Sequence, residues 1–408
     1  MTRSAESDDI ATARFMPRLR PSLFWRARRS SPGAALLLPV CRDLSSALTE
    51  LRWIQAHVDG PDTKTADAGR SRRRTTKGQQ KVLALCRRRG RGEPLQYVLG
   101  TQPFGPLDLL CRRGVLIPRP EPEAYSMHLA DLLLQERARE SSHGALQAPL
   151  TILDACTGTG CIALLLYARL RQRAEAARRA PVRVVGVDLV PAAVSLARAN
   201  AVRNGLASGH EGSSTVSSGS VSSVRFVQGD LFADDDWLHE PAVQSLLQQT
   251  DGAQPPRLDV LVSNPPYVST DGFARDTARS VRLFEPKLAQ VPDVVRASLD
   301  HHGQPYRDAT AAAAEDVFYV RLLDLATRLD ARILLCETGG LEQAERVVAL
   351  ALAKASAKAS PSLLEVEIWA DQPDIVDVDD PDRSVTVTGR TVAIKGSGHG
   401  RSVFIRRR

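Results

Sequence analysis

The sequence predicts an α/β protein in which a mostly parallel sheet carries helices on both faces. Between residues 150 and 369, short apolar runs rich in β-branched residues alternate with longer segments of helical periodicity. Parallel neighbouring strands must be joined by a crossover, which is usually a helix, so this alternation favours a mostly parallel sheet. The 408 residues also exceed the usual size of one compact domain, which predicts a second, smaller folded unit.

The composition limits the class of protein without naming a partner. Hydrophobic residues make up 43% and charged residues 25%, as in globular proteins, and no apolar run approaches the length of a membrane span. The formal net charge of +7 suits an acidic or nucleic-acid-rich setting. The six cysteines include no C-x-x-C pair, and His301 and His302 have no further ligand at a suitable spacing. We therefore expect reduced thiols in an intracellular protein and no metal site.

The first 40 residues are basic and do not resemble a folded element. No acidic residue lies between Asp9 and Asp43, and the arginines in this gap include Arg14, Arg18, Arg20, Arg26, Arg28 and Arg29. This composition is typical of a mitochondrial transit peptide, although the acidic residues at positions 6–9 are unusual for one. We predict that residues 1–40 direct the protein to the mitochondrial matrix. The alternative is a disordered basic tail on a cytoplasmic protein.

Residues 41–91 are predicted to form a small helical domain. Leu44, Leu48 and Leu51 follow helical spacing, as do the apolar residues near position 85. Ten basic residues and no acidic residue lie between Asp67 and Glu93. Residues 70–91 could therefore contact RNA or an acidic protein surface, but a solvated face is the simpler interpretation and we favour it.

Residues 92–123 are predicted to be a hairpin linker. Glycines and prolines end short β-prone pieces in its first half, which favours a hairpin. The segment 115–121 is extended, because a residue that precedes proline avoids the helical region. An amphipathic helix follows from Ala124 to about Glu140, and the larger domain is predicted to cover residues 124–408.

A ligand-binding turn is predicted where the first strand of the larger domain ends. The strand pattern of residues 150–154 leads into a loop of small residues and then into a helix, as in nucleoside-binding and phosphate-binding turns. Gly158 and Gly160 allow close approach of the backbone to a ligand. The spacing is neither G-x-G-x-x-G nor that of a P-loop. The second strand ends at Asp188, where a carboxylate can bind ribose hydroxyls or cap the next helix.

The rest of the larger domain continues the alternation. Strands are predicted at residues 224–228, 258–263, 333–337 and 364–369, and helices at residues 317–329 and 341–357. Two polar segments, residues 207–223 and 233–257, are predicted to be inserted loops.

Asn264-Pro265-Pro266-Tyr267 directly follows the predicted strand at residues 258–263. Prolines stop a strand abruptly, so this sequence places an amide, two rigid carbonyls and an aromatic ring at the carboxyl edge of the sheet. Open α/β sheets bind ligands at that edge. The alternative is a simple surface turn. The residues alone indicate only a planar nitrogen held by two acceptors.

Several of these motifs together resemble the HemK/PrmC family of peptide-chain-release-factor glutamine methyltransferases. The resemblance covers the chain from about Gly92 to the C-terminus. The matching motifs are residues 92–97 with Gly100 and Phe104, residues 115–121, residues 154–160, Asp188, Asp230, residues 264–267, Glu285-Pro286 and residues 337–339. The Pro-Arg-Pro-Glu sequence at residues 118–121 is the most selective of them. The resemblance implies a class I methyltransferase fold dependent on S-adenosylmethionine (SAM), with a Rossmann-like seven-stranded sheet and a small N-terminal helical domain.

The resemblance also implies the reaction and the residues that perform it. A methyl group passes from SAM to the side-chain amide nitrogen of the glutamine in the Gly-Gly-Gln motif of a class I release factor. Asn264 and Pro265 accept hydrogen bonds from the amide, Pro266 fixes the backbone, and Tyr267 offers a flat face. The residues implied to bind SAM are Asp154, Cys156, Thr157, Gly158, Thr159, Gly160, Asp188, Asp230, Leu231 and Asn264. Those implied to form the wall of the substrate pocket are Phe104, Arg119 and Glu121.

The sequence departs from the family pattern at some positions, and two other functions are possible for it. Cys156 stands where the family has glycine, and residues 287–316 keep little of the family's glycine-rich segment beyond Gly303. Asn-Pro-Pro-Tyr also serves methyltransferases that act on the exocyclic amine of adenine in DNA or RNA, which is the first alternative. The second is a non-catalytic binding protein on a methyltransferase fold. We expect a monomer with no membrane contact.

Overall fold

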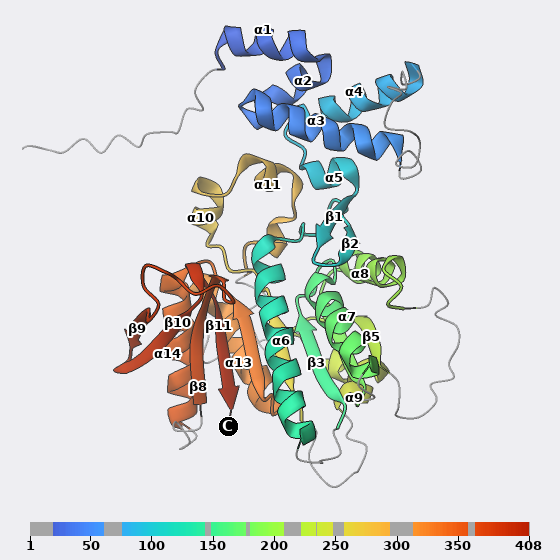
Figure 1. Cartoon of the computed structure of the whole chain (residues 1–408). Coiled ribbons are helices and arrows are strands. Elements are labelled where there is room, and N and C mark those ends of the chain that lie inside the picture. The colour runs from blue at the N-terminus through green and yellow to red at the C-terminus, as the bar shows by residue number, and fades with distance from the viewer. Residues whose placement is uncertain are drawn as a thin grey trace, which may run out of the picture. The chain divides into compact units, whose positions relative to one another are not determined.

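The computed structural model describes residues 19–60, 76–142, 148–176, 180–207, 222–233, 235–247, 257–293, 313–357 and 364–407. The chain divides into two compact units, Met1–Leu99 and Gly100–Arg408 (Figure 1). Within the described ranges, no helix is long and apolar enough to cross a membrane, and no group of side chains is suited to hold a metal ion.

The first unit is helical. Its helices are α1 (Pro21–Ser30), α2 (Pro32–Cys41), α3 (Leu44–Asp59), α4 (Thr76–Gly90) and α5 (Leu95–Leu99). Asp43 caps α3, because its carboxylate accepts a hydrogen bond from the Ser46 N–H at 2.8 Å. The core includes Leu37 and Leu38 of α2, Ile54 of α3 and Cys86 of α4, all fully buried.

The prediction that residues 1–40 are unfolded is wrong for residues 21–40. These residues form α1 and most of α2, and α2 packs against α3 and α4. The apolar run from Ala34 to Val40 is helical and buries Leu37 and Leu38, which outweighs the basic character of the preceding residues. Residues 1–18 lie outside the described residues, so their targeting role stays a prediction.

Part of the basic run at residues 70–91 serves the helical unit itself. Arg89 forms an ion pair with Glu50 of α3 at 2.8 Å, and both side chains are largely buried. Arg88 pairs with Glu93 at 2.7 Å. These arginines therefore tie α4 to neighbouring segments and are not simply a solvated face. Residues 70–75 lie outside the described residues.

The second unit opens with a hairpin that lies within the predicted linker at residues 92–123, although residues 95–99 of that linker form α5 of the first unit. Strands β1 (Thr101–Phe104) and β2 (Leu107–Leu110) pair antiparallel, with Phe104 opposite Leu107. Helix α6 (Pro120–Ser142) starts four residues before the predicted start at Ala124. Proline is favoured in the first turn of a helix, where its missing N–H has no helical partner, so Pro120 suits this start.

The main sheet of the second unit confirms the predicted fold class and extends it. Its order is β5-β4-β3-β6-β7-β11-β8-β10-β9. The strands are β3 (Leu150–Ala155), β4 (Val182–Asp188), β5 (Ser223–Gln228), β6 (Val260–Ser263), β7 (Ile333–Glu337), β8 (Leu364–Gln372), β9 (Ser384–Val387), β10 (Arg390–Lys395) and β11 (Ser397–Arg407). Strands β3 to β7 are parallel to one another, and β11 is antiparallel to both β7 and β8. Strands β9 and β10 lengthen the expected seven-stranded sheet at one edge.

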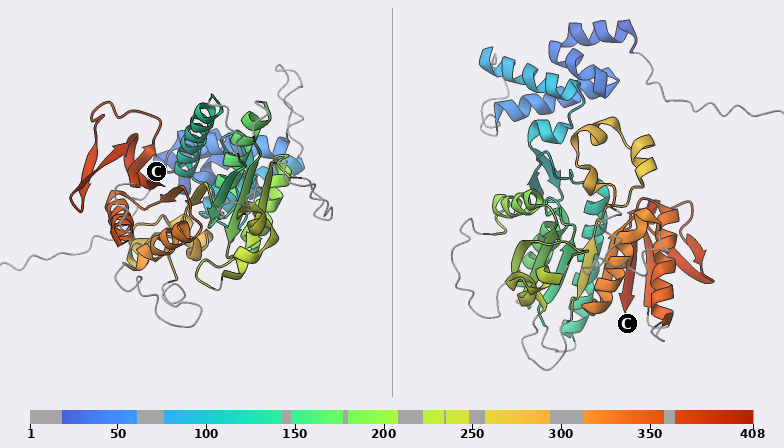
Figure 2. Two further views of the ribbon diagram at one scale, coloured as in Figure 1. Left: turned by 90° about the horizontal axis from the view of Figure 1, so that it is seen from below. Right: turned by 180° about the vertical axis from the view of Figure 1, so that it is seen from behind.

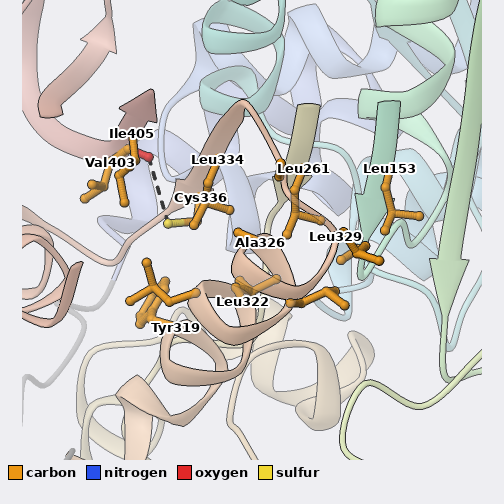
Figure 3. Packing of buried hydrophobic residues seen from close by; sticks show 14 of the residues in the cluster. Leu153, Leu261, Tyr319, Leu322, Ala326, Leu329, Leu334, Cys336, Val403 and Ile405 are labelled. Carbon is orange, nitrogen blue, oxygen red and sulfur yellow. Dashed lines mark hydrogen bonds between the residues drawn. The ribbon is translucent and has the colours of Figure 1, made fainter. Parts of the chain in front are cut away.

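Helices cover both faces of this sheet (Figures 1 and 2). On one face pack α6, α7 (Cys161–Ala176) and α8 (Pro191–Arg203); on the other pack α9 (Pro241–Leu247), α13 (Val317–Arg328) and α14 (Leu341–Ala357). Alternate strand residues serve the two cores, so Ile152 faces the first set of helices and Leu153 the second. Figure 3 shows the second core, where Tyr319 and Leu322 of α13 lie beneath Cys336 of β7.

The prediction of a plain polar loop at residues 233–257 is wrong in part. Residues Asp235–His239 form a 3₁₀ turn, and Pro241–Leu247 form α9. Trp237, Val243 and Leu246 are buried in the second core. These apolar residues are spaced for a helix, but the polar residues around them conceal the pattern. Most of the other predicted insertion, residues 208–221, lies outside the described residues.

Candidate functional site

A pocket in the second unit lies at the carboxyl ends of β3, β4 and β6. Its lining includes residues from six sequence regions that the prediction singled out. The lining residues include Val115, Ile117, Arg119, Cys156, Thr157, Gly158, Thr159, Asp188, Asp230, Leu231, Asn264, Pro266, Pro286, Leu288 and Phe318. Parallel strands end at the same edge, and β4 and β6 both pair with β3, so these side chains converge. Most of the lining is apolar, with a few polar groups among it, as in small-molecule sites.

The turn after β3 presents backbone to this pocket. Gly158 has φ of +56°, and a Cβ added there would meet no atom within 4 Å, so the space beside it is open. Cys156 has φ of +62°, a left-handed conformation that is strained for a side chain other than glycine. This strain is the physical reason for the expectation of glycine at this position. The Thr157 N–H donates to the Val187 carbonyl at 2.9 Å and ties the turn to β4.

Gly160, which was expected to contact the cofactor, has a packing role in this structure. It does not line the pocket. A Cβ at this position would lie 3.0 Å from Ala197 Cβ and 3.0 Å from the Phe226 ring. Gly160 therefore allows the turn to pack against α8 and β5.

Asp154 is also not part of the pocket wall. Its side chain is fully buried, and Oδ2 accepts hydrogen bonds from the Thr157 hydroxyl at 2.6 Å and from the Ala163 N–H at 3.2 Å. It thus fixes both ends of the ligand-facing turn. Burial raises the pKa of Asp154 to about 7, against the lowering effect of those two hydrogen bonds.

This raised pKa predicts a pH-dependent stability. A carboxyl whose pKa is higher in the folded state favours folding when it is protonated, and that contribution is lost as the pH rises from about 4 to about 7. Asp154→Asn removes the titration. Over this pH range the wild type should lose free energy of unfolding relative to the variant. The difference between the two should change by on the order of 4 kcal/mol at most. Urea denaturation at pH 4.5 and pH 7.5 measures this; a constant difference would contradict it.

Asp188 lies at the end of β4, where the sequence predicts it, and lines the pocket. Its Oδ2 accepts from the Gly158 N–H at 2.8 Å and its Oδ1 from the Val190 N–H at 2.9 Å. The carboxylate therefore both holds the glycine turn and starts α8, and its remaining lone pairs can accept from a ligand. Burial raises the pKa of Asp188. Asp230 accepts from the Phe232 N–H at 3.0 Å, which places Leu231 in the wall.

Asn264 and Pro266 line the same pocket, but Pro265 and Tyr267 do not. The Tyr267 hydroxyl instead donates to Glu337 Oε1 at 2.9 Å. The expectation that Tyr267 presents a flat face to a ligand is thus not met by the pocket lining. At the start of this turn, the Ser263 hydroxyl donates to the Ala155 carbonyl at 2.8 Å, which fixes β6 against the cofactor turn.

Of the three predicted wall residues, only Arg119 lines the pocket. Arg119 pairs with Glu285 at 2.7 Å, and Glu285 also accepts from the Ile117 N–H at 3.1 Å. Glu285 was not predicted as a site residue, although the Glu-Pro sequence that contains it marked the region. Phe104 is 1% exposed and packs in the core of α6 and α7, and Glu121 lies in the first turn of α6 outside the pocket lining.

Several known proteins are similar to this chain in sequence. No family model matches the chain. The mitochondrial MRF1 N(5)-glutamine methyltransferase MTQ1 of Saccharomyces cerevisiae is 32% identical over 279 residues, covering 68% of this chain and 69% of that protein. A probable MRF1 mitochondrial N(5)-glutamine methyltransferase of Schizosaccharomyces pombe is 34% identical, covering 64% and 69%. A release factor glutamine methyltransferase of Geobacter sulfurreducens is 34% identical, covering 51% and 54%.

Proposed function

Because the chain belongs to the release factor glutamine methyltransferase family, we propose that it methylates the glutamine of the Gly-Gly-Gln motif in a mitochondrial peptide chain release factor. The methyl group comes from SAM and goes to the side-chain amide nitrogen. The observation that carries the proposal is the meeting of Asn264 with the glycine turn and Asp188 in one pocket.

The residues present fit SAM. This cofactor supplies an electrophilic methyl group on a sulfonium centre. Gly158 leaves open space where a side chain would obstruct a ligand, Asp188 can accept from ribose hydroxyls, and Leu231 offers an apolar contact for a base.

Asn264 is suited to orient an amide. The nitrogen of an amide is a weak nucleophile, because its lone pair is delocalised into the carbonyl. One of its N–H groups can donate to the Asn264 side-chain oxygen in the pocket, which turns the face of the nitrogen toward the methyl group. The family resemblance assigns the second N–H to the carbonyl of Pro265, which adjoins the lining residues Asn264 and Pro266 but is not itself one of them. Positioning of this kind contributes several kcal/mol to a barrier. Ile117, Pro266 and Phe318 contribute to the apolar lining of the same pocket.

Transfer of labelled methyl groups from SAM tests the proposed function. The acceptors are a mitochondrial release factor, the same factor with the Gly-Gly-Gln glutamine changed to glutamate, and an adenine-containing oligonucleotide. We expect label on the unaltered factor alone. Label on the oligonucleotide alone would favour the adenine methyltransferase, and label on no acceptor would favour a non-catalytic binding protein.

We also propose a mitochondrial location, which the basic N-terminal residues and the mitochondrial relatives support. A reporter fused to residues 1–40 should enter mitochondria, and a cytosolic reporter would contradict this. Since α2 places Leu37 and Leu38 in the helical core, a targeting segment that is removed should end before Pro32. N-terminal sequencing of the mature protein measures the cleavage point.

A further inference from the structure

Tyr267 is held at two points by residues far from it in the sequence. Its hydroxyl donates to Glu337 Oε1 at 2.9 Å, and its main-chain carbonyl accepts from Gln343 Nε2 at 3.3 Å. Glu337 is the last residue of β7, and Gln343 lies in the first turn of α14. The end of β7 and the start of α14 therefore hold Tyr267, the last residue of the Asn264–Tyr267 turn, through two hydrogen bonds.

The orientation of Gln343 is itself fixed. Its side-chain oxygen accepts from the Gly339 N–H at 2.7 Å, and its side-chain nitrogen donates to Asp316 Oδ1 at 2.8 Å. Asp316 is 2% exposed and forms an ion pair with Arg346. With a backbone donor on one side and a carboxylate on the other, only one orientation of the amide satisfies both neighbours. One N–H of Gln343 therefore goes to Asp316, and the other is directed at the main-chain carbonyls of Tyr267, at 3.3 Å, and Glu315, at 3.4 Å.

Gly339 brings this segment against the tyrosine ring. A Cβ on Gly339 would lie 3.3 Å from Tyr267 Cδ2 and 3.1 Å from Gln343 Oε1. A larger residue would therefore push on both the ring and the amide that holds it. The Arg401 side chain donates to the Gly339 carbonyl at 3.1 Å and keeps the glycine in place.

The Glu337 carboxyl is buried beside two tyrosine hydroxyls. It is 2% exposed, its Oε1 accepts from the Tyr267 hydroxyl at 2.9 Å, and the buried Tyr125 hydroxyl is its other hydrogen-bonding neighbour. Burial raises its pKa to about 7. Burying a carboxyl costs stability relative to an apolar side chain of similar size unless its hydrogen bonds offset that cost. The bond to Tyr267 is the one that connects this carboxyl to the Asn264–Tyr267 turn.

We propose that Glu337 and Gln343 are positioning residues for methyl transfer, which hold Tyr267 and thereby fix the Asn264 amide and the Pro265 carbonyl without touching either substrate. The two prolines transmit this restraint, because their φ angles are locked and the turn between Asn264 and Tyr267 has little freedom. The inference rests on the proposed function, since it assigns roles within the same site.

Substitutions at Glu337 test this inference. Glu337→Leu removes the acceptor for the Tyr267 hydroxyl, and we expect kcat to fall about 10- to 100-fold, as for a small misplacement of reacting groups. The dissociation constant for SAM should change less than about threefold, because the glycine turn and Asp188 are untouched. Glu337→Gln keeps an acceptor oxygen and should restore kcat to within about threefold of the wild type.

The matched control is Tyr319→Phe. The Tyr319 hydroxyl donates to the main-chain carbonyl of Glu337 at 2.8 Å, so this variant also removes a buried tyrosine hydroxyl bonded to the same residue. It should lower the melting temperature and leave kcat unchanged. Equal loss of kcat in Tyr319→Phe and Glu337→Leu would overturn the inference, as would wild-type kcat in Glu337→Leu.

Hydrogen exchange separates this inference from the proposed function, because it needs no methyl acceptor. In Glu337→Leu, amides in a peptide covering residues 264–269 should exchange faster than in the wild type, while those of residues 156–163 keep their rates. Unchanged exchange at residues 264–269 would overturn the inference. If the wild type methylates no release factor, the proposed function fails, and the exchange rates still decide whether Glu337 restrains the turn.

Discussion

Replacing Asn264 by alanine should lower kcat by about 10²- to 10³-fold and leave the affinity for SAM nearly unchanged. The side chain of Asn264 lies in the pocket at the end of β6, whereas the glycine turn and Asp188 that fit the cofactor belong to other segments. The alanine variant therefore loses an acceptor that orients the amide nitrogen, and it keeps the cofactor contacts. Steady-state kinetics with a release factor and calorimetric titration with SAM measure the two effects.

Two further variants sharpen this test. Asn264→Asp keeps an acceptor oxygen and should lose less activity than Asn264→Ala. Asn204→Ala removes an asparagine whose side chain accepts from the Asp108 N–H at 3.0 Å and does not line the pocket, so kcat should stay at the wild-type value. A parallel loss of SAM binding and turnover in Asn264→Ala would show that Asn264 serves the cofactor instead.

Asp188→Ala should have the largest effect on the cofactor. The variant loses the carboxylate that accepts from the Gly158 N–H, and with it the acceptor offered to a ribose. Hydrogen bonds to a charged group contribute about 1.5–3 kcal/mol each, so we expect the dissociation constant for SAM to rise about 100-fold. Equilibrium binding measures this without any methyl acceptor.

Asp259 provides the matched control for Asp188. Its Oδ2 accepts from the Thr151 N–H at 2.9 Å, so it also joins a carboxylate to a backbone amide between segments of the sheet. It lies just before β6, at the opposite end of that strand from Asn264. Asp259→Ala should lower the melting temperature and leave the SAM dissociation constant unchanged. A similar weakening of SAM binding in both variants would attribute the effect of Asp188 to loss of stability.

The sequence predicts those parts of the site that follow from local patterns of adjacent residues. The strand and turn at residues 150–160 and the strand that ends at Asp188 are local patterns, and topology then brings them to Asn264. Glu285 and Gln343 could not be predicted in this way, because their partners at Arg119 and Tyr267 lie 166 and 76 residues away. The local sequence does not show whether a polar residue is exposed or is buried beside a partner that is distant in the chain.

Other elements and residues were missed or misassigned for a similar reason. The arginines of residues 20–29 conceal α1, whose pattern is amphipathic but whose one buried residue is the small Ala27. Phe104 belongs to a motif that resembles a substrate wall, but the hairpin turns its ring into the core beneath α6. Strands β9 and β10 are short and have no long apolar run, since apolar residues make up only half of each.

The position of β11 imposes an order on how the sheet can assemble. This strand, Ser397–Arg407, follows β8, β9 and β10 in the chain but lies between β7 and β8. A polypeptide that emerges amino end first can pair β3 to β7 while β7 still presents an unpaired edge. Strand β8 cannot join the sheet until the last eleven-residue strand is available to bridge the gap. Until then β7 offers its free backbone groups to other chains, and a chaperone that covers nascent edges would protect the protein at that stage.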